Sequence, residues 1–149
     1  MMMRRTKKEG DINRDKWVGI GGHFEADESP EECLIREVKE ETGLTLASRK
    51  LRGVITFISD HWPTEYMFLY TATVDKLREL PECDEGELEW VDKSKVYSLP
   101  LWAGDRIFFR LLETRAEFFS LKLRYRGEEL VEAVLDGESR LQNFSEKNL

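Results

Sequence analysis

The stretch GHFEADESPEECLIREVKEETGL, residues 22–44, decides how this chain is organised. Ser29 is typical of a helix N-cap, Pro30 suits the first helical position, and Glu32 completes a capping box with Ser29. Gly43 is typical of the residue that follows a helix end. The stretch therefore predicts a helix that begins after Ser29 and ends just before Gly43.

The predicted helix has one apolar side and one acidic side. At about 100° per residue, Leu34, Ile35 and Val38 fall on one arc, which is predicted to be the buried stripe. A separate arc carries three carboxylates, namely Glu37, Glu40 and Glu41. Like charges at this spacing repel, at about 0.2–0.5 kcal/mol per pair, so the clustering requires a reason.

Two interpretations account for the acidic side. Hard divalent cations such as Mg²⁺ bind carboxylate oxygens together with water and substrate phosphates. The alternative is a solvated, charged helix face, which is the common meaning of a helix rich in Glu and Lys. The periodicity of the helix by itself favours the solvated face.

The composition indicates a globular protein. The chain has 149 residues, of which 40% are hydrophobic and 11% aromatic, so a single domain over residues 1–149 is expected. A net charge of -7 argues against general binding to nucleic acid, whereas an acidic protein can act on phosphates through metal ions. No apolar run approaches the roughly 20 residues that span a bilayer. The start MMMRRTKK lacks the apolar region of a signal peptide.

The two cysteines, Cys33 and Cys83, indicate a reducing compartment. They lie far apart in the chain and outside any spacing typical of a metal site. Free thiols in the cytoplasm are the simplest interpretation.

The rest of the chain predicts a mixed α+β fold. Runs of β-branched and aromatic residues predict strands at residues 52–59, 65–74, 87–91, 118–126 and 129–136. Apolar positions at helical spacing predict a second helix over residues 101–113. Gly127 is expected to turn the last two strands into a hairpin.

The spacing of charged residues in the stretch 22–44 carries a family resemblance. Gly22, five residues, Glu28, seven residues and then REVKEETGL agree at every position with G-x5-E-x7-R-E-U-x-E-E-x-G-U, where U is aliphatic. Chance agreement is on the order of one in a billion per starting position. The chain therefore resembles the Nudix hydrolases, which cleave nucleoside diphosphates linked to a further group. The resemblance implies an α/β/α sandwich around a mixed sheet with a loop–helix–loop, and it reverses the preference for a solvated face.

The resemblance implies roles for the charged residues of the motif. Glu37, Glu40 and Glu41 resemble the family's ligands for Mg²⁺ or Mn²⁺, and one of them can also polarise the attacking water. Arg36 resembles the residue that orients these glutamates, and its spacing also allows an i, i+4 pair with Glu40. Glu28 resembles the supporting carboxylate near the helix start.

The residues before the helix are candidates by the same resemblance. Gly22 resembles a tight-loop residue of the metal site, and Gly21 is expected to contact substrate. Trp17 is expected either near the wall of a pocket or in the core. Arg5 is a candidate phosphate contact, although a surface charge at a strand end is the favoured interpretation. His23 is not required by the motif and is expected to be a bystander.

The second half of the chain resembles, more loosely, the oxidised-purine nucleoside triphosphatases of the family. Glu85 matches an acidic loop position that faces the metals, as a ligand or general base; an acidic surface loop is the equal alternative. Trp102 and Asp105 match positions of the base pocket, where an aromatic ring stacks and a carboxyl group binds the base edge; core packing is the alternative for Trp102.

Three departures from that subgroup bear on substrate and fold. Val18 stands where an asparagine reads the base, and Gly104 replaces one of two paired aspartates. The base range is therefore expected to extend to ordinary or differently modified nucleotides. The family's usual first strand is expected to be missing, since MMMRR resembles the next one; either the sequence is truncated or the sheet is completed in another way.

The function expected from these residues is that of a Mg²⁺-dependent nucleoside triphosphate diphosphatase. The favoured substrate is 8-oxo-dGTP or another oxidised purine nucleotide, cleaved to the monophosphate and pyrophosphate. ADP-ribose, a dinucleoside polyphosphate or a sugar nucleotide is the alternative substrate, and a non-catalytic nucleotide sensor is the alternative class. The partner is expected to be a free nucleotide, without nucleic-acid polymer or membrane, and the protein a monomer or homodimer.

Overall fold

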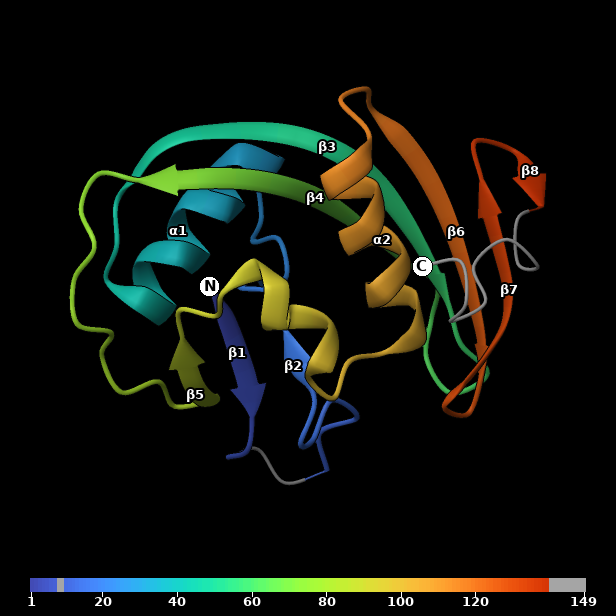
Figure 1. Cartoon of the computed structure of the whole chain (residues 1–149), viewed down its shortest axis with the longest axis horizontal. Coiled ribbons are helices and arrows are strands. Elements are labelled where there is room, and N and C mark those ends of the chain that lie inside the picture. Colours follow the sequence, from blue (N-terminus) through green and yellow to red (C-terminus); the bar gives the residue numbers. More distant parts are fainter. Residues whose placement is uncertain (8–9, 140–149) are drawn as a thin grey trace. The chain divides into compact units, whose positions relative to one another are not determined.

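The computed structural model describes residues 1–7 and 10–139 (Figure 1). The chain forms two compact units. The first unit comprises Met1–Ser48 and Ala72–Leu101, and the second comprises Arg49–Thr71 and Trp102–Leu149. Helices and strands of both pairing directions occur, so the predicted mixed α+β class is confirmed. No helix in the described part of the chain is long and apolar enough to cross a membrane.

The first unit contains a three-stranded antiparallel sheet with the order β2-β1-β5. Its strands are β1 (Met2–Arg5), β2 (Trp17–Val18) and β5 (Gly86–Glu89). The register pairs Arg5 with Gly86. Glu85, the residue before β5, is thereby placed beside the end of β1.

Helix α1 (Pro30–Thr42) forms where the sequence predicts it. The Ser29 hydroxyl accepts a hydrogen bond from the Glu32 amide, and the Glu32 carboxylate accepts one from the Ser29 amide. Gly43 ends the helix in the left-handed conformation, with φ of 67°. Both predicted caps are confirmed.

The predicted buried side of α1 was wrong in one position. Ile35 is 43% exposed, and the buried residues are Cys33, Val38 and Thr42. The buried side is rotated from the prediction, so Glu37, whose side chain is 14% exposed, also lies on its margin. The helix leaves an isoleucine in solvent and turns a carboxylate inward.

The second unit is built on a mixed sheet with the order β4-β3-β6-β7-β8. Its strands are β3 (Leu46–Ile58), β4 (Glu65–Val74), β6 (Phe119–Arg126), β7 (Glu129–Leu135) and β8 (Glu138–Ser139). β3 pairs with β6 in parallel and β6 with β7 antiparallel, which confirms the mixed sheet. The first residues of β3 and the last of β4 belong to the first unit.

Helix α2 (Ala103–Thr114) supplies the core of the second unit from one side of this sheet. Its buried residues Ile107 and Leu111 pack with alternate residues of β6. These are Phe119, Leu121, Leu123 and Tyr125. β6 thus buries one face with a period of two, and the strand predicted at residues 118–126 is confirmed.

Several element bounds differ from the prediction. β3 begins at Leu46, whereas the predicted strand begins at residue 52. The prediction missed the first half of β3 because it is polar and exposed and carries no apolar alternation. β5 ends at Glu89. The short strands β2 and β8 and the 3₁₀ helix Lys93–Ser98 were not predicted, since such short elements have no periodicity to detect.

Candidate active site

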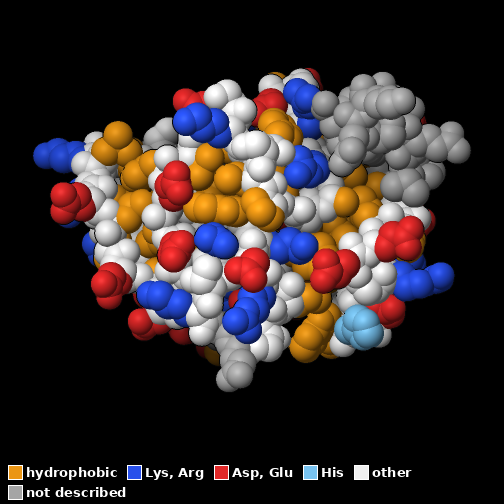
Figure 2. Space-filling model, turned by 60° about the horizontal axis from the view of Figure 1, so that its bottom comes forward, with side chains coloured by type: hydrophobic (Ala, Val, Ile, Leu, Met, Phe, Trp, Pro, Cys, Tyr) orange, Lys and Arg blue, Asp and Glu red, His pale blue; other side chains and the backbone are white. Residues whose placement is uncertain are grey.

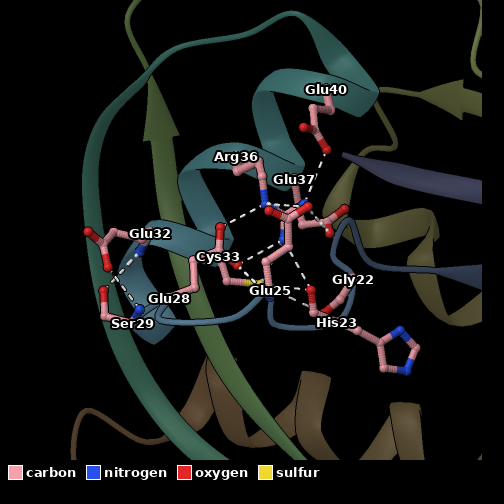
Figure 3. Close-up of polar contacts among 10 residues, drawn as sticks. All are labelled: Gly22, His23, Glu25, Glu28, Ser29, Glu32, Cys33, Arg36, Glu37 and Glu40. Carbon is pink, nitrogen blue, oxygen red and sulfur yellow. Dashed lines mark hydrogen bonds and ion pairs between the residues drawn. The ribbon is translucent and has the colours of Figure 1, made fainter.

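The guanidinium group of Arg36 joins the carboxylates of the motif (Figure 3). It binds Glu28 through two bonds, Nε to Oε1 at 2.7 Å and Nη2 to Oε2 at 2.9 Å. Its Nη1 donates to Glu37 at 2.7 Å and to Glu40 at 3.1 Å, which confirms the predicted i, i+4 pair. Nη2 also donates to the carbonyl of His23 at 3.1 Å, while the His23 ring points away from this group.

These contacts fix the charge states of Arg36 and Glu28. The hydrogen bond from Arg36, followed by that from the Glu25 amide, lowers the pKa of Glu28 to about 2. Hydrogen bonding to Glu28 and then Glu37 raises the pKa of Arg36. Both groups are therefore ionised at neutral pH, and Arg36 offsets the repulsion between carboxylates that the sequence leaves unexplained.

Gly22 lets the loop backbone approach the carboxylate of Glu37. A Cβ atom at position 22 would lie 2.2 Å from Oε1 and 2.3 Å from Cδ of Glu37. No other residue fits at that distance without moving Glu37. Contact with the Glu37 side chain is therefore the reason for glycine at this position, and the role of Gly22 in the metal site stays a prediction.

Glu41 carries a buried carboxylate oxygen that is not hydrogen-bonded. Its Oε2 has no hydrogen-bond partner among the described residues. Burial, followed by the charges of Glu85 and Glu37, raises the pKa of Glu41 to about 7, while the Gly21 amide and Arg5 act in the opposite direction. The acidic side of α1 is thus not uniformly solvated, because one oxygen of Glu41 is enclosed. A buried oxygen of this kind, surrounded by negative charge, is suited to a cation.

Glu85 and Arg5 form an ion pair whose charges both act on Glu41. Arg5 Nη1 donates to the Glu85 carboxylate, and Arg5 Nε donates to Asp11 Oδ2 at 2.6 Å. The Arg5 side chain is only 14% exposed, so its interpretation as a surface charge was wrong: β1 ends against the loop that holds Asp11. The effect of Glu85 on Glu41 favours an electrostatic role at the site over an isolated surface loop.

The metal-binding role of these glutamates stays a prediction. In residues 1–7 and 10–139, no three His, Cys, Asp or Glu side chains are placed so as to hold a metal ion. The side chains of Glu37 and Glu40 face Arg36, and that of Glu85 faces Arg5. The donor set nevertheless fits a hard cation, because it consists of carboxylate oxygens and includes the unpartnered Oε2 of Glu41.

Trp17, a candidate for a pocket wall or for the core, is 9% exposed in β2. Its amide donates to the carbonyl of Pro100 at 2.9 Å. The burial fits the core interpretation, and a contact with substrate stays a prediction.

The two candidate base-binding residues lie at the start of α2 in the second unit. Trp102 is the N-cap residue and packs edge-on against Tyr125, with ring centroids 5.5 Å apart. Asp105 lies in the first turn, where burial raises its pKa to about 7. Asp105 can therefore donate or accept a hydrogen bond near neutral pH.

Tyr125 explains why position 104 lacks a carboxylate. Its hydroxyl accepts a hydrogen bond from the Gly104 amide at 2.7 Å. A Cβ atom at position 104 would lie 2.7 Å from that hydroxyl and 2.5 Å from Leu123 Cδ1. Neither Tyr125 nor Asp11 is among the residues predicted from the sequence to belong to the site. Alternation in β6 could have placed Tyr125 on the buried face, whereas the DIN sequence at Asp11 signals only a turn.

The burial of Asp105 makes stability depend on pH. The folded-state pKa lies above the usual 3.8, so folding disfavours the charged form and stability falls as pH rises through about 4 to 7. In Asp105→Asn this loss is absent. The free energy of unfolding of the variant, relative to that of wild type, should therefore rise by up to about 3 kcal/mol between pH 5 and pH 8. Urea unfolding at the two pH values measures the difference, and a pH-independent difference would contradict it.

A model of the NUDIX domain matches residues 1–112. Because this match covers more than half of the chain, the protein belongs to the Nudix hydrolase family. The capped helix, the Arg36 contacts and the close approach at Gly22 are the structural counterparts of the sequence motif.

Named relatives and a solved structure add detail. The chain is similar to an uncharacterized Nudix hydrolase of Bacillus subtilis, with 38% identity over 96 residues, which are 62% of this chain and 61% of that protein. It is 32% identical over 134 residues to an oxidized purine nucleoside triphosphate hydrolase of Danio rerio, covering 87% and 83% of the two chains. The crystal structure of a mutator MutT protein from Bacillus halodurans matches 92% of this chain and 89% of that one, with a TM-score of 0.79 and 31% identity.

Proposed function

We propose that this Nudix hydrolase is a divalent-cation-dependent nucleoside triphosphate diphosphatase that favours oxidised purine nucleotides such as 8-oxo-dGTP. The observation that carries the proposal is the buried Oε2 of Glu41, which has no hydrogen-bond partner among the described residues and is influenced by the charges of Glu85 and Glu37. The similarity to an oxidized purine nucleoside triphosphate hydrolase supports the substrate class.

The cation site consists of Glu37, Glu40 and Glu41 on α1, with Glu85 and the carbonyl of Gly22 as further oxygen donors. Mg²⁺ or Mn²⁺, when bound, supplies charge neutralisation for the triphosphate and acidifies the attacking water. Arg36 holds Glu37 and Glu40 in fixed orientations, so these side chains need little reorganisation during the reaction.

The proposed reaction breaks the P–O bond between the α- and β-phosphates. A water oxygen bonds to one of these two phosphorus atoms as its bond to the bridging oxygen breaks, and the bridging oxygen leaves with the other phosphate group. The products are the nucleoside monophosphate and pyrophosphate. Glu41 and Glu85 are the candidates for accepting the proton of that water. Glu41 is a candidate because its Oε2 has no hydrogen-bond partner among the described residues.

The base is proposed to contact Trp102 and Asp105. The indole ring supplies a stacking surface, and the Asp105 carboxyl group binds the edge of the base. By the sequence resemblance, Val18 and Gly104 stand where related enzymes carry polar groups, and Tyr125 occupies the space beside Gly104. A pocket with one polar side chain distinguishes between bases less sharply than a pocket with three. Ordinary purine nucleotides are therefore expected to be slower substrates.

A cytoplasmic protein acting on free nucleotides, as a monomer or homodimer, completes the proposal. Cys33 and Cys83 are both free and buried. Acidic and basic side chains are interspersed on the face in Figure 2, where a nucleic-acid polymer would favour a continuous basic surface.

A substrate panel tests the proposal. We expect kcat/KM with Mg²⁺ to be highest for 8-oxo-dGTP, lower for dGTP and dATP, and lowest for ADP-ribose, a dinucleoside polyphosphate and a sugar nucleotide. Equal values for the three triphosphates would remove the preference for an oxidised base but leave the diphosphatase. A higher value for one of the last three compounds would contradict the substrate class.

A further inference from the structure

Asp11, Arg5 and Glu85 form a chain of ion pairs at the end of β1, the central strand of the three-stranded sheet. Arg5 Nε binds Asp11 Oδ2 at 2.6 Å, and Arg5 Nη1 binds Glu85. The side chains of Asp11 and Arg5 are 7% and 14% exposed, whereas that of Glu85 is 40% exposed. Two enclosed groups therefore hold one outer carboxylate.

The Asp11 carboxylate is fixed by its own loop. Its Oδ1 accepts a hydrogen bond from the Asn13 amide at 2.9 Å, and its carbonyl accepts one from the Arg14 amide at 3.0 Å. The backbone of Arg5 is fixed as well, since its amide donates to the carbonyl of Lys16 at 3.0 Å. Both ends of the Asp11–Arg5 pair are thus anchored independently of Glu85.

The backbone of Glu85 is held beside Arg5 by strand pairing. Gly86 is the register partner of Arg5, and a Cβ atom at position 86 would lie 2.0 Å from the carbonyl oxygen of Arg4. The carbonyl of Glu85 accepts a hydrogen bond from the Lys7 amide at 3.4 Å. What remains adjustable is the direction of the Glu85 carboxylate, and Arg5 is its ion-pair partner.

We propose that Asp11 and Arg5 are positioning residues for Glu85: Asp11 orients the Arg5 guanidinium, which orients the Glu85 carboxylate for the cation bound at α1. The inference rests on the cation site of the proposed function. A carboxylate has about four acceptor positions, so Glu85 retains capacity for a cation while it accepts a bond from Arg5. Partners of this outer kind change metal affinity or activity by about 10- to 100-fold.

A double-mutant cycle tests this arrangement of Asp11, Arg5 and Glu85, which we call the relay. Its readout is the binding of Mn²⁺ alone, measured by electron paramagnetic resonance. Asp11→Asn keeps the shape of the side chain and removes its charge, and it should weaken Mn²⁺ binding by about 10-fold. Glu85→Gln should weaken it as well. If Asp11 acts through Glu85, the double variant binds no more weakly than Glu85→Gln, because the second change has nothing left to disturb.

The control variant is Asp15→Asn in the same loop. Asp15 pairs with Arg4 at 3.7 Å, its side chain is 69% exposed, and asparagine tolerates its φ of 64°. Asp15→Asn should bind Mn²⁺ as wild type does. Unfolding temperatures of all variants are recorded, and if Asp11→Asn does not fold, Arg5→Lys, which keeps the charge but lacks the fork of donors, replaces it in the cycle.

Wild-type affinity in Asp11→Asn would overturn the relay. Losses of Asp11→Asn and Glu85→Gln that multiply in the double variant, as a purely structural role predicts, would overturn it as well. Because no nucleotide is present, failure of the proposed substrate class leaves the test intact. A wild-type protein that binds no Mn²⁺ would overturn the relay and the cation site together, whereas one that binds Mn²⁺ without cleaving any nucleotide would overturn only the proposed activity.

Discussion

Glu41→Gln is expected to lower kcat for 8-oxo-dGTP by about 10³-fold, which corresponds to about 4 kcal/mol of transition-state stabilisation. The substitution preserves the shape of the side chain but removes the charge of a carboxylate whose buried Oε2 has no hydrogen-bond partner among the described residues. The variant should remain folded, because burial and the charges of Glu85 and Glu37 disfavour the ionised carboxylate in the absence of a cation. Steady-state kinetics and thermal unfolding measure the two effects.

Two further variants complete this experiment, one as a negative control and one as a second test of the acidic side of α1. Glu31→Gln makes the same chemical change in the first turn of α1 and should retain wild-type turnover. Glu40→Gln, in a side chain that is 59% exposed, should also lose turnover, through its predicted contact with the cation. Wild-type kcat in both Glu40→Gln and Glu41→Gln would refute the assignment of this helix as the catalytic one.

Gly22→Ala is expected to reduce kcat by about 10²-fold, since a displacement of about 1 Å in a catalytic group has an effect of that size. The added methyl group would lie 2.2 Å from Glu37 Oε1 and must push that carboxylate away from Arg36. Helix α1 itself should persist, because its caps at Ser29 and Gly43 are untouched.

Gly19→Ala is the matched control for this change, because a Cβ at position 19 would meet no atom within 4 Å among the described residues beyond its chain neighbours. Kinetics of the two alanine variants, compared at equal helix content by circular dichroism, separate the contact from a general effect on the loop. Equal activity of Gly22→Ala and Gly19→Ala would show that Glu37 does not need its present position.

Local rules were sufficient for the parts of the site that lie close together in the chain. The capping box at Ser29 and Glu32, the stop at Gly43 and the pair between Arg36 and Glu40 each depend on residues three or four positions apart. Such interactions are set by helix geometry, and all of them are confirmed.

Features that depend on distant residues could not be predicted in the same way. The rotation of α1 that leaves Ile35 exposed and encloses Oε2 of Glu41 is set by packing, not by periodicity. Arg5 and Glu85 are 80 positions apart, and pairing of β1 with β5 brings them together. The contact between Tyr125 and Gly104 likewise requires α2 to pack on β6.

Product analysis tests the central claim most directly. Wild-type protein is incubated with 8-oxo-dGTP and Mg²⁺, or with a chelator, and the release of pyrophosphate and of orthophosphate is quantified separately. We predict one pyrophosphate for each nucleoside monophosphate, only with Mg²⁺, and almost none from Glu41→Gln. Release of orthophosphate with a nucleoside diphosphate, or equal turnover in the presence of the chelator, would contradict the account.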